Sequence, residues 1–361
     1  MIVARVSLAG FRSYASLDLD LEPGLVLVVG PNGVGKTNLL EAIHVGAQGF
    51  SPRTRAEPRL VRFGEQAARV RLEGSEGGAP VGAEVTVALG EGKRILFNGA
   101  PAASAEELRS RLAALVFVPD RLAVVKGGPA VRRAYVDRML GRIFPSQAGL
   151  SGEYGRALAQ RNEALRRVRA GASSREAVEP WTERVAALGG ELDSARARLV
   201  ALLAPAFAEH AAALGLAGAT VAYDERGLPR EELEARLERD LERGTTGVGP
   251  HLRDVEIRAA DRELRGFGSQ GEQRTAVLAF VLAETSVLAE RRGTPPLLLL
   301  DDVLSELDGD RRRALLAALP PGGQTLVSAT SRDAVPAGGP APAQVVEVRR
   351  EGNASVAETA R

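Results

Sequence analysis

The feature that most constrains what this chain can fold into is the glycine-rich segment GPNGVGKT at residues 30–37. A continuous apolar run, LVLVV at residues 25–29, precedes it, and Leu39, Leu40 and Ile43 follow it at helical spacing. Glycines at this spacing between a buried strand and a helix let backbone N–H groups and the helix N-terminus surround an anion. The segment therefore predicts a phosphate-binding loop of the G-x-x-x-x-G-K-[ST] type.

The residues of this loop have expected tasks in holding ATP and Mg²⁺. We expect Lys36 to reach the β- and γ-phosphates and to act in catalysis, and the Thr37 hydroxyl to be a ligand of Mg²⁺. The nucleotide-binding residues expected from the motif are Gly30, Pro31, Asn32, Gly33, Val34, Gly35, Lys36 and Thr37. A chance glycine-rich turn is the alternative, but the strand before the loop and the helix after it argue against that interpretation.

A second apolar run ends in two acids. Four leucines at residues 297–300 are followed by Asp301 and Asp302. Alone, this pattern would indicate a buried strand with a polar exit, but beside a phosphate-binding loop it predicts a Walker B strand whose Asp301 binds Mg²⁺. Because successive side chains of a strand point to opposite sides, Asp302 is expected to face the attacking water as a catalytic carboxylate.

Two shorter segments resemble motifs that ABC ATPases carry near Walker B. Residues 269–274, SQGEQR, resemble the signature that opens a helix and offers a second anion site to a nucleotide held by another subunit. The expected signature residues are Ser269, Gln270, Gly271 and Glu272. Residues 305–308, SELD, resemble the D-loop of a dimer interface, with Asp308 as its candidate residue. A helix N-cap and a surface turn are the plainer alternatives.

The rest of the chain has sheet-like ends and a helical middle. Residues 2–21 and 69–97 alternate apolar and polar side chains, which predicts antiparallel strands with a turn at Gly77–Gly78. Residues 181–202 have the apolar spacing of a packed helix, interrupted at Gly189–Gly190, and residues 231–243 predict a second helix that stops at Gly244. We therefore expect an α/β head at residues 1–121 and 245–361 and a helical lobe at residues 122–244.

Composition excludes several classes of protein. The chain has 361 residues and no cysteine, so disulfides and thiolate metal sites are ruled out. Its three histidines are far apart, which argues against a zinc site. No apolar run is long enough for a membrane span, and residues 1–10 lack the apolar core of a signal peptide, so we expect a cytoplasmic location. The net charge of +1 means that a basic surface would require segregation of charges.

Together these motifs resemble the SMC-like branch of the ABC ATPases, and the segments between them resemble its bacterial recombination and repair members. The similarity covers nearly the whole chain. It is carried by the nucleotide motifs and by FRSY at 11–14, KGGP at 126–129, RRAYVD at 132–137 and GPH at 249–251. The resemblance implies an ABC-type P-loop ATPase head with a flanking antiparallel β-subdomain and an inserted all-helical lobe.

The resemblance also implies a function. It points to a DNA-binding ATPase that forms a homodimer on ATP, binds duplex or single-strand/double-strand junction DNA without sequence preference, and works with RecO and RecR to load RecA. Hydrolysis is expected to be weak, stimulated by DNA, and to release the dimer. By the same resemblance, Arg12 and Ser13 are candidates for nucleotide contact, with exposed turn residues as the alternative.

Two departures from the ABC pattern qualify this expectation. Transporter-type ABC proteins have Glu after the Walker B Asp, whereas this chain has the shorter Asp302, which favours slow hydrolysis. Where many ABC proteins have a switch His, this chain has Thr330, which can donate a hydrogen bond but carries no charge.

Two other functions remain open at this point. One is a nucleotide-binding subunit of a transporter, which the helical middle argues against. The other is a structural SMC-type protein, for which the apolar seam is too short. DNA contacts, if present, would come from cations of the helical middle, although a solvated face is the simpler explanation for any one of them. The candidates are Lys126, Arg132, Arg133, Arg156, Arg161, Arg166 and Arg167.

Overall fold

The computed structural model describes residues 1–118 and 122–360. These residues form two compact units, one comprising residues 1–118, 209–216 and 277–360 and the other residues 122–208 and 217–276. The predicted boundary at 244–245 does not coincide with this division. Strand β10 (Val255–Ala259) pairs with β9 (Thr220–Tyr223), and because of this pairing residues 245–276 belong to the second unit.

The first unit contains an antiparallel sheet with the strand order β2-β1-β4-β5-β6-β7. The alternation of apolar and polar residues predicted its main strands, including the Gly77–Gly78 turn between β4 and β5. The apolar residues of each strand face one side and are buried there, as in Val70 and Leu72 of β4. The strands are β1 (Ile2–Phe11), β2 (Tyr14–Asp20), β4 (Ala67–Glu76), β5 (Ala79–Ala88), β6 (Gly92–Phe97) and β7 (Ala100–Pro101).

The same unit contains a mainly parallel sheet with the order β15-β14-β3-β13-β12-β8. All pairs are parallel except β14 with β15. The four leucines of β12 are fully buried, as expected for a strand covered on both faces. The strands are β3 (Gly24–Val29), β8 (Ala114–Phe117), β12 (Leu297–Leu300), β13 (Gln324–Ala329), β14 (Gln344–Glu351) and β15 (Ala354–Thr359).

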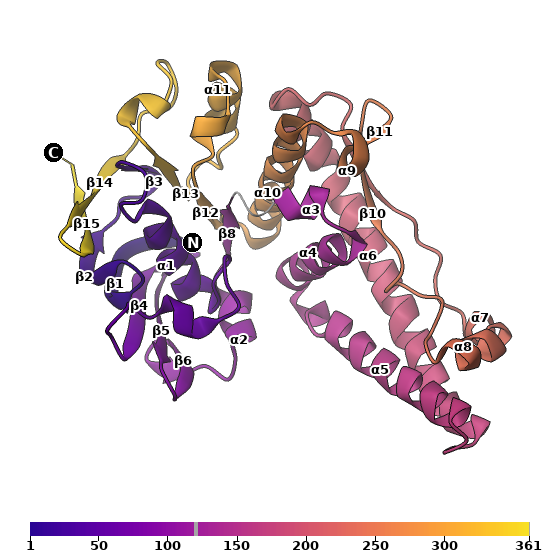
Figure 1. Ribbon diagram of the computed structural model, residues 1–361. Coiled ribbons are helices and arrows are strands. Elements are labelled where there is room, and N and C mark those ends of the chain that lie inside the picture. The colour runs from indigo at the N-terminus through magenta and orange to yellow at the C-terminus, as the bar shows by residue number, and fades with distance from the viewer. Residues whose placement is uncertain (119–121, 361) are drawn as a thin grey trace. The chain divides into compact units, whose positions relative to one another are not determined.

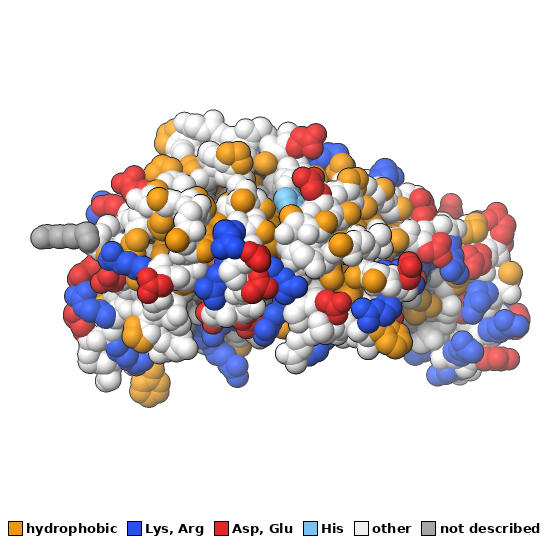
Figure 2. Space-filling model, turned by 90° about the horizontal axis from the view of Figure 1, so that it is seen from above, with side chains coloured by type: hydrophobic (Ala, Val, Ile, Leu, Met, Phe, Trp, Pro, Cys, Tyr) orange, Lys and Arg blue, Asp and Glu red, His pale blue; other side chains and the backbone are white. Residues whose placement is uncertain are grey.

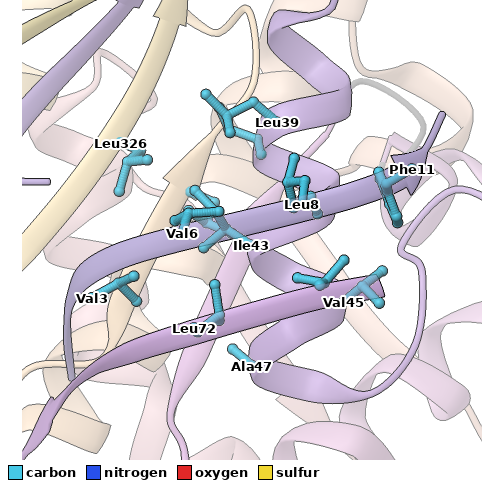
Figure 3. Packing of buried hydrophobic residues seen from close by; sticks show 14 of the residues in the cluster. Val3, Val6, Leu8, Phe11, Leu39, Ile43, Val45, Ala47, Leu72 and Leu326 are labelled. Atoms are coloured by element: carbon cyan, nitrogen blue, oxygen red, sulfur yellow. The ribbon is translucent and has the colours of Figure 1, made fainter. Parts of the chain in front are cut away.

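Helix α1 (Lys36–Gln48) contacts both sheets and fills the core between them. Figure 3 shows Leu39 and Ile43 of this helix beside Val6 and Leu8 of β1. The helix is buried along nearly its whole length, with an apolar cluster that takes in residues from both sheets. This packing fixes the start of α1, and with it the glycine-rich loop, against the ends of the parallel strands.

Short helices and turns complete the first unit. Helix α11 begins at Gly309, and β13 follows it. The C-terminal strands β14 and β15 were not predicted. The additional elements are η1 (Glu57–Leu60), α2 (Ala105–Arg111), η5 (Leu304–Glu306), α11 (Gly309–Ala317) and η6 (Arg332–Ala334).

The second unit is mostly helical and also has a small antiparallel sheet, β11-β10-β9. Helices α6 and α10 begin in this unit and run on into the first. Figure 1 shows α5 and α6 as its longest elements. Besides β9 and β10, the elements are α3 (Ala123–Lys126), α4 (Pro129–Ile143), η3 (Pro145–Gln147), α5 (Leu150–Arg169), η4 (Arg175–Val178), α6 (Glu179–Ala213), α7 (Arg230–Ala235), α8 (Leu237–Arg243), β11 (Arg262–Glu263), α9 (Leu264–Phe267) and α10 (Gln270–Arg292).

Helix α6 corrects one prediction. It runs without interruption through Gly189 and Gly190. Gly189 allows other elements to approach closely, and this packing outweighs the low helix propensity of glycine. A Cβ atom at Gly189 would lie 2.5 Å from Leu228 and 3.1 Å from the ring of Tyr154. Trp181, expected in the packed seam, is 37% exposed.

The predicted helix at 231–243 is divided into α7 and α8 at Arg236. At this break the carbonyl of Leu233 accepts a hydrogen bond of 3.5 Å from the buried Arg161 guanidinium. Helix α8 ends as predicted at Gly244, which has a positive φ of 70°.

Surface charges are mixed. Figure 2 shows Lys and Arg side chains interspersed with Asp and Glu over the face that it presents. In residues 1–118 and 122–360, the structure contains no helix that combines the length and the apolarity needed to cross a bilayer.

Candidate nucleotide-binding site

The glycine-rich loop connects β3 to α1 in a conformation that requires glycine. Gly30, Gly33 and Gly35 have φ values of 155°, 81° and 116°, which side-chain-bearing residues rarely adopt. A Cβ atom at Gly30 would also lie 2.2 Å from the carbonyl oxygen of Val348. The backbone therefore turns tightly enough for its N–H groups to face an anion at the start of α1.

Lys36 is the first residue of α1 and is almost buried. Its ammonium donates hydrogen bonds to the carbonyls of Gly30 at 2.7 Å and Pro31 at 2.9 Å. Burial lowers the pKa of Lys36, and the carboxylates of Asp302 and Asp301 oppose that effect. The ammonium thus lies within the loop, among groups of opposite charge, where a triphosphate would be held.

Thr37 and Asp301 bring the two main motifs together from positions 264 residues apart. The Thr37 hydroxyl donates to Asp301 Oδ1 at 3.0 Å, and the Ser328 hydroxyl donates to the same oxygen at 2.7 Å. Asp301 is 4% exposed, and burial raises its pKa, whereas the two hydroxyl donors lower it. The carboxylate is therefore held in place by residues of α1 and β13.

Asp302 leaves the end of β12 with a positive φ of 51°, which is uncommon for a side-chain-bearing residue. Its backbone N–H donates to Ser328 Oγ at 2.8 Å. Its Oδ1 atom is buried and accepts no hydrogen bond from the described residues. A strained backbone and an unsatisfied buried oxygen are features of residues shaped for a ligand rather than for stability.

The oxygen atoms at this place suit Mg²⁺. Thr37 and Asp301 supply a hydroxyl and a carboxylate, and beside them the buried Oδ1 of Asp302 has no hydrogen-bond partner among the described residues. Mg²⁺ prefers such ligands and usually takes only one or two from the protein, completing its shell with water and phosphate. Among the described residues there is no cluster of three or more His, Cys, Asp or Glu side chains that could hold a metal alone.

Arg12 and Ser13 both lie beside the loop, in the turn between β1 and β2. The Arg12 guanidinium forms two hydrogen bonds with the buried Glu41 carboxylate, at 2.7 and 3.0 Å, and its φ is 51°. Arg53 contacts the same carboxylate at 3.1 Å, and the Ser51 hydroxyl donates to it. Glu41 lies one helical turn after Thr37, so these arginines are attached to the helix that bears the loop.

Ser13 contacts the loop through a chain of hydroxyl groups. Its Oγ accepts from Asn38 at 2.8 Å and from Ser355 at 2.7 Å, and Ser355 lies against the carbonyl of Val34. Sequence reasoning missed Ser328, Ser355 and Glu41. Ser328 lies two residues before the switch position Thr330, which is a signal that could have been used, whereas Ser355 lies in a strand that was not predicted.

The signature segment lies in the second unit and opens α10. Ser269 Oγ accepts from the Glu272 backbone N–H at 3.2 Å, and the Glu272 carboxylate accepts from the Ser269 N–H at 2.7 Å. This reciprocal pair is a capping box. Ser269, Gln270 and Gly271 are exposed, so the start of the helix is open to approach.

The remaining candidates of the first unit have local roles. Asp308 caps α11 by accepting from the Arg311 N–H at 2.9 Å, and Ser305 donates to the carbonyl of Asp302 at 2.9 Å. Thr330 is exposed after β13 and forms no hydrogen bond within the described residues. The D-loop and switch roles of Asp308 and Thr330 stay predictions.

Two of the arginines considered for DNA contact are part of the interior. Arg161 is fully buried and bound to Asp240 at 2.8 Å, and Arg132 is buried and paired with Asp254. Arg133 donates to the carbonyl of Arg253 at 2.7 Å. These cations stabilise the second unit, because a buried charge needs its partner. Arg156 and Arg167 are exposed.

The sequence as a whole matches a known family. Residues 2–351 match the model of the RecF/RecN/SMC N terminal domain. Similar curated proteins include the DNA replication and repair protein RecF of Myxococcus xanthus, 39% identical over 89% of this chain and 88% of that protein. Another is RecF of Frankia alni, 38% identical over 93% of this chain and 95% of that protein. The chain belongs to the RecF family.

Solved structures agree with membership of the RecF family. The chain is similar to the recombination mediator protein RecF with ATP, with a TM-score of 0.85, 26% identity and 99% of both chains covered. A structure of RecF with ATPrS gives the same TM-score at 25% identity. An Smc head bound to the C-winged helix domain of ScpA, 18% identical with a TM-score of 0.62, shares the fold. The fold is therefore that of an ABC-type ATPase head, as predicted.

Proposed function

We propose that this chain is an ATP-dependent DNA-binding protein of recombination and repair that dimerises on ATP. It binds MgATP at residues 30–37, hydrolyses it slowly, and closes two nucleotides between two copies of itself. Duplex or junction DNA is bound without sequence preference, and RecO and RecR act with the dimer to load RecA. Hydrolysis releases the dimer.

The hydrogen bond between Thr37 and Asp301 is the observation that carries this proposal. It joins the phosphate loop to the Walker B strand at a place where oxygen ligands and a buried ammonium surround one point. The similar RecF structures with ATP and with ATPrS support a nucleotide at this place. The names of the curated relatives support DNA repair over transport.

The expected chemistry follows from the placement of the side chains. On binding ATP, Lys36 exchanges the carbonyls of Gly30 and Pro31 for phosphate oxygens. Thr37 and Asp301 hold Mg²⁺, which when bound neutralises charge on the β- and γ-phosphates. Asp302 accepts a proton from, or orients, the attacking water, and its short side chain makes turnover slow.

The second half of each site comes from the other subunit. The exposed Ser269 and Gly271 at the start of α10 offer hydrogen-bond donors to a γ-phosphate. The capping box leaves the Ser269 hydroxyl hydrogen available, because in that contact the oxygen accepts. ATP would therefore link two heads, and its loss would separate them.

Sedimentation velocity with and without ATP, alone and with junction DNA, tests this function. The wild type is expected to shift from monomer to dimer with ATP, and duplex DNA should increase its ATPase rate. Lys36→Arg replaces a compact ammonium with a larger planar guanidinium in a tight space, so it should abolish the dimer or turnover. Ser269→Arg should keep nucleotide binding to the monomer but block the dimer.

Two results would count against the proposal. If DNA changes neither the ATPase rate nor the sedimentation of the wild type with ATP, the DNA-binding function is wrong. A normal ATP-dependent dimer of Ser269→Arg would show that this segment serves only as a helix cap.

A further inference from the structure

The turn that leads into β4 presents an isolated aromatic side chain to solvent. Phe63 is 103% exposed, the highest value among the exposed large apolar residues of the described chain. Leaving a phenyl ring in water gives up the stabilisation that burial would supply. The whole ring is open to contact by a partner.

The turn is anchored on both sides. Glu65 N–H donates to the Arg62 carbonyl at 3.0 Å, and Gly64 has a φ of 89°, which places Phe63 at the tip of a tight turn. Arg62 N–H donates to the carbonyl of Gly10 at 2.8 Å, and Arg12 N–H donates to that of Leu60 at 2.8 Å. The ring is thus presented by a backbone fixed to the end of β1.

Arginines flank this turn in the sequence. Arg55 and Arg59 precede the ring, and Arg69 follows it at the start of β4. All three are exposed, and none of their side chains forms a hydrogen bond or ion pair with the described residues. Of the two acids between residues 52 and 66, Glu57 is neutralised by Lys93.

The sheet register places another cation in line with Arg69. Arg69 lies opposite Thr86 of β5, and Thr86 lies opposite Arg94 of β6. Directly opposite residues share a face, so the two arginines project from the same exposed side, roughly 10 Å apart across two strand spacings. Arg94 is also exposed and unpaired within the described residues.

We propose that Phe63, with the arginines that flank it in the sequence, Arg55, Arg59 and Arg69, and with Arg94 on the same sheet face as Arg69, binds the single-strand side of a DNA junction. The arginines contact phosphates, and the Phe63 ring stacks on the first unpaired base. This inference rests on the proposed DNA-binding function and adds the place and the chemical basis of junction preference.

A nucleic-acid strand fits these side chains better than a protein surface does. Exposed arginines and an exposed ring match the phosphates and bases of a single strand, for which stacking is tolerant of sequence. An apolar protein anchor would be expected within a larger apolar patch. The exposed apolar residue attached to the same turn is Leu89, whose N–H donates to the Gln66 carbonyl at 2.9 Å.

The Phe63 turn is also connected by hydrogen bonds to residues near the nucleotide site. Arg62 in this turn donates a hydrogen bond from Nη1 to the carbonyl of Ser13. In the segment before the turn, Arg53 forms an ion pair with Glu41 of α1. Occupation of the surface by DNA would therefore act on the helix that carries the phosphate loop. This gives DNA a physical route to the ATPase site.

Binding of three DNAs to the intact protein with ATP tests the proposal. Fluorescence anisotropy is measured with a blunt duplex, a duplex with a single-stranded overhang, and a single strand. For Phe63→Leu, which keeps an apolar side chain but removes the ring, affinity for the overhang should fall about five-fold or more. Affinity for the blunt duplex should stay within about two-fold, since phosphates dominate there.

Matched variants distinguish the effect of the Phe63 ring from the effects of neighbouring residues. Phe63→Trp should keep the wild-type preference, because it retains a flat aromatic face. Leu89→Ala, which removes exposed apolar surface from the neighbouring turn, should bind all three DNAs like the wild type. The double change Arg69→Gln with Arg94→Gln should weaken binding of the overhang DNA and of the single strand, and for these two DNAs it should lower the slope of log affinity against log salt by about one or two.

A fluorescence readout places the ring against the base. Trp181 is the sole tryptophan of the chain, so Phe63→Trp combined with Trp181→Phe reports on position 63 alone. Overhang DNA should quench this tryptophan, and blunt duplex should not.

The outcomes distinguish the two levels of the argument. If the wild type binds none of the DNAs, the proposed function itself fails, and this inference with it. If the wild type binds junction DNA and Phe63→Leu binds it equally well, DNA binding stands and the assignment of Phe63 is overturned, leaving a protein partner for the turn.

Discussion

At the scale of single residues, the nucleotide site is organised by hydroxyl groups that support the charged ones. Thr37 and Ser328 hold Asp301 from two elements, and Ser328 also accepts from the N–H of Asp302. The charged residues of this set were predicted from sequence, because their motifs have fixed spacing. Ser328 was not, because a serine at a strand end has no distinctive spacing and its partners are 26 and 27 residues away.

Ser328→Ala should impair hydrolysis and stability together. It removes a donor to the buried Asp301 carboxylate and leaves the Asp302 N–H without its acceptor, at a cost of about 1–3 kcal/mol in the free energy of unfolding. The ATPase rate should also require a higher Mg²⁺ concentration. Urea unfolding and Mg²⁺ titration of the rate measure the two effects. Ser331→Ala, an exposed hydroxyl after the same strand, is the control; equal behaviour of the two variants would contradict this role for Ser328.

At the scale of elements, the parallel strands were predictable where both faces are buried, as in the leucines of β12. Strand β15 was missed because its short polar alternation lies at a sheet edge, and β9 because only a few residues pair within a largely helical region. The break expected in α6 was wrong because Gly189 serves close packing rather than termination. Local propensity favours a helix end at two glycines, but tertiary contacts decide otherwise.

The two glycines of α6 should therefore respond in opposite ways to substitution. Gly189→Val would push a side chain into the buried Leu228 and the ring of Tyr154 and should destabilise the protein by about 1–3 kcal/mol. Gly190→Ala meets nothing within 4 Å and should stabilise it by roughly 0.5–1 kcal/mol. Chemical denaturation compares them. A neutral Gly189→Val would mean that the close approach at this point contributes little.

At the scale of the whole molecule, the two units differ in how polar their interiors are. The first unit has a continuous apolar cluster around α1. The second includes buried ion pairs such as Arg161–Asp240, together with a Tyr154–His251 contact at 2.7 Å. Burial lowers the pKa of His251 below its ordinary value of 6.5. The fold class and its ATPase character followed from sequence, but this internal pairing did not, since it depends on side chains brought together by folding.

Acid should destabilise the protein in part through His251. Because its pKa is lower folded than unfolded, the unfolded chain binds a proton first as pH falls below about 6.5, and stability present above that pH is lost. His251→Gln should be less stable at pH 7.5 but lose less between pH 7.5 and pH 5.5 than the wild type does. Thermal denaturation at the two pH values measures the difference, and an unchanged loss in the variant would contradict the assignment.

The dimer proposed here requires each nucleotide to be completed by the Ser269 turn of a second subunit. Mixing Lys36→Arg with Ser269→Arg tests this most directly, because the mixed pair contains one site with an intact Lys36 loop and an intact Ser269 turn. Sedimentation velocity with ATP should show more dimer in the mixture than for either variant alone. If the mixture remains as monomeric as its components while the wild type dimerises, completion of the site in trans is wrong.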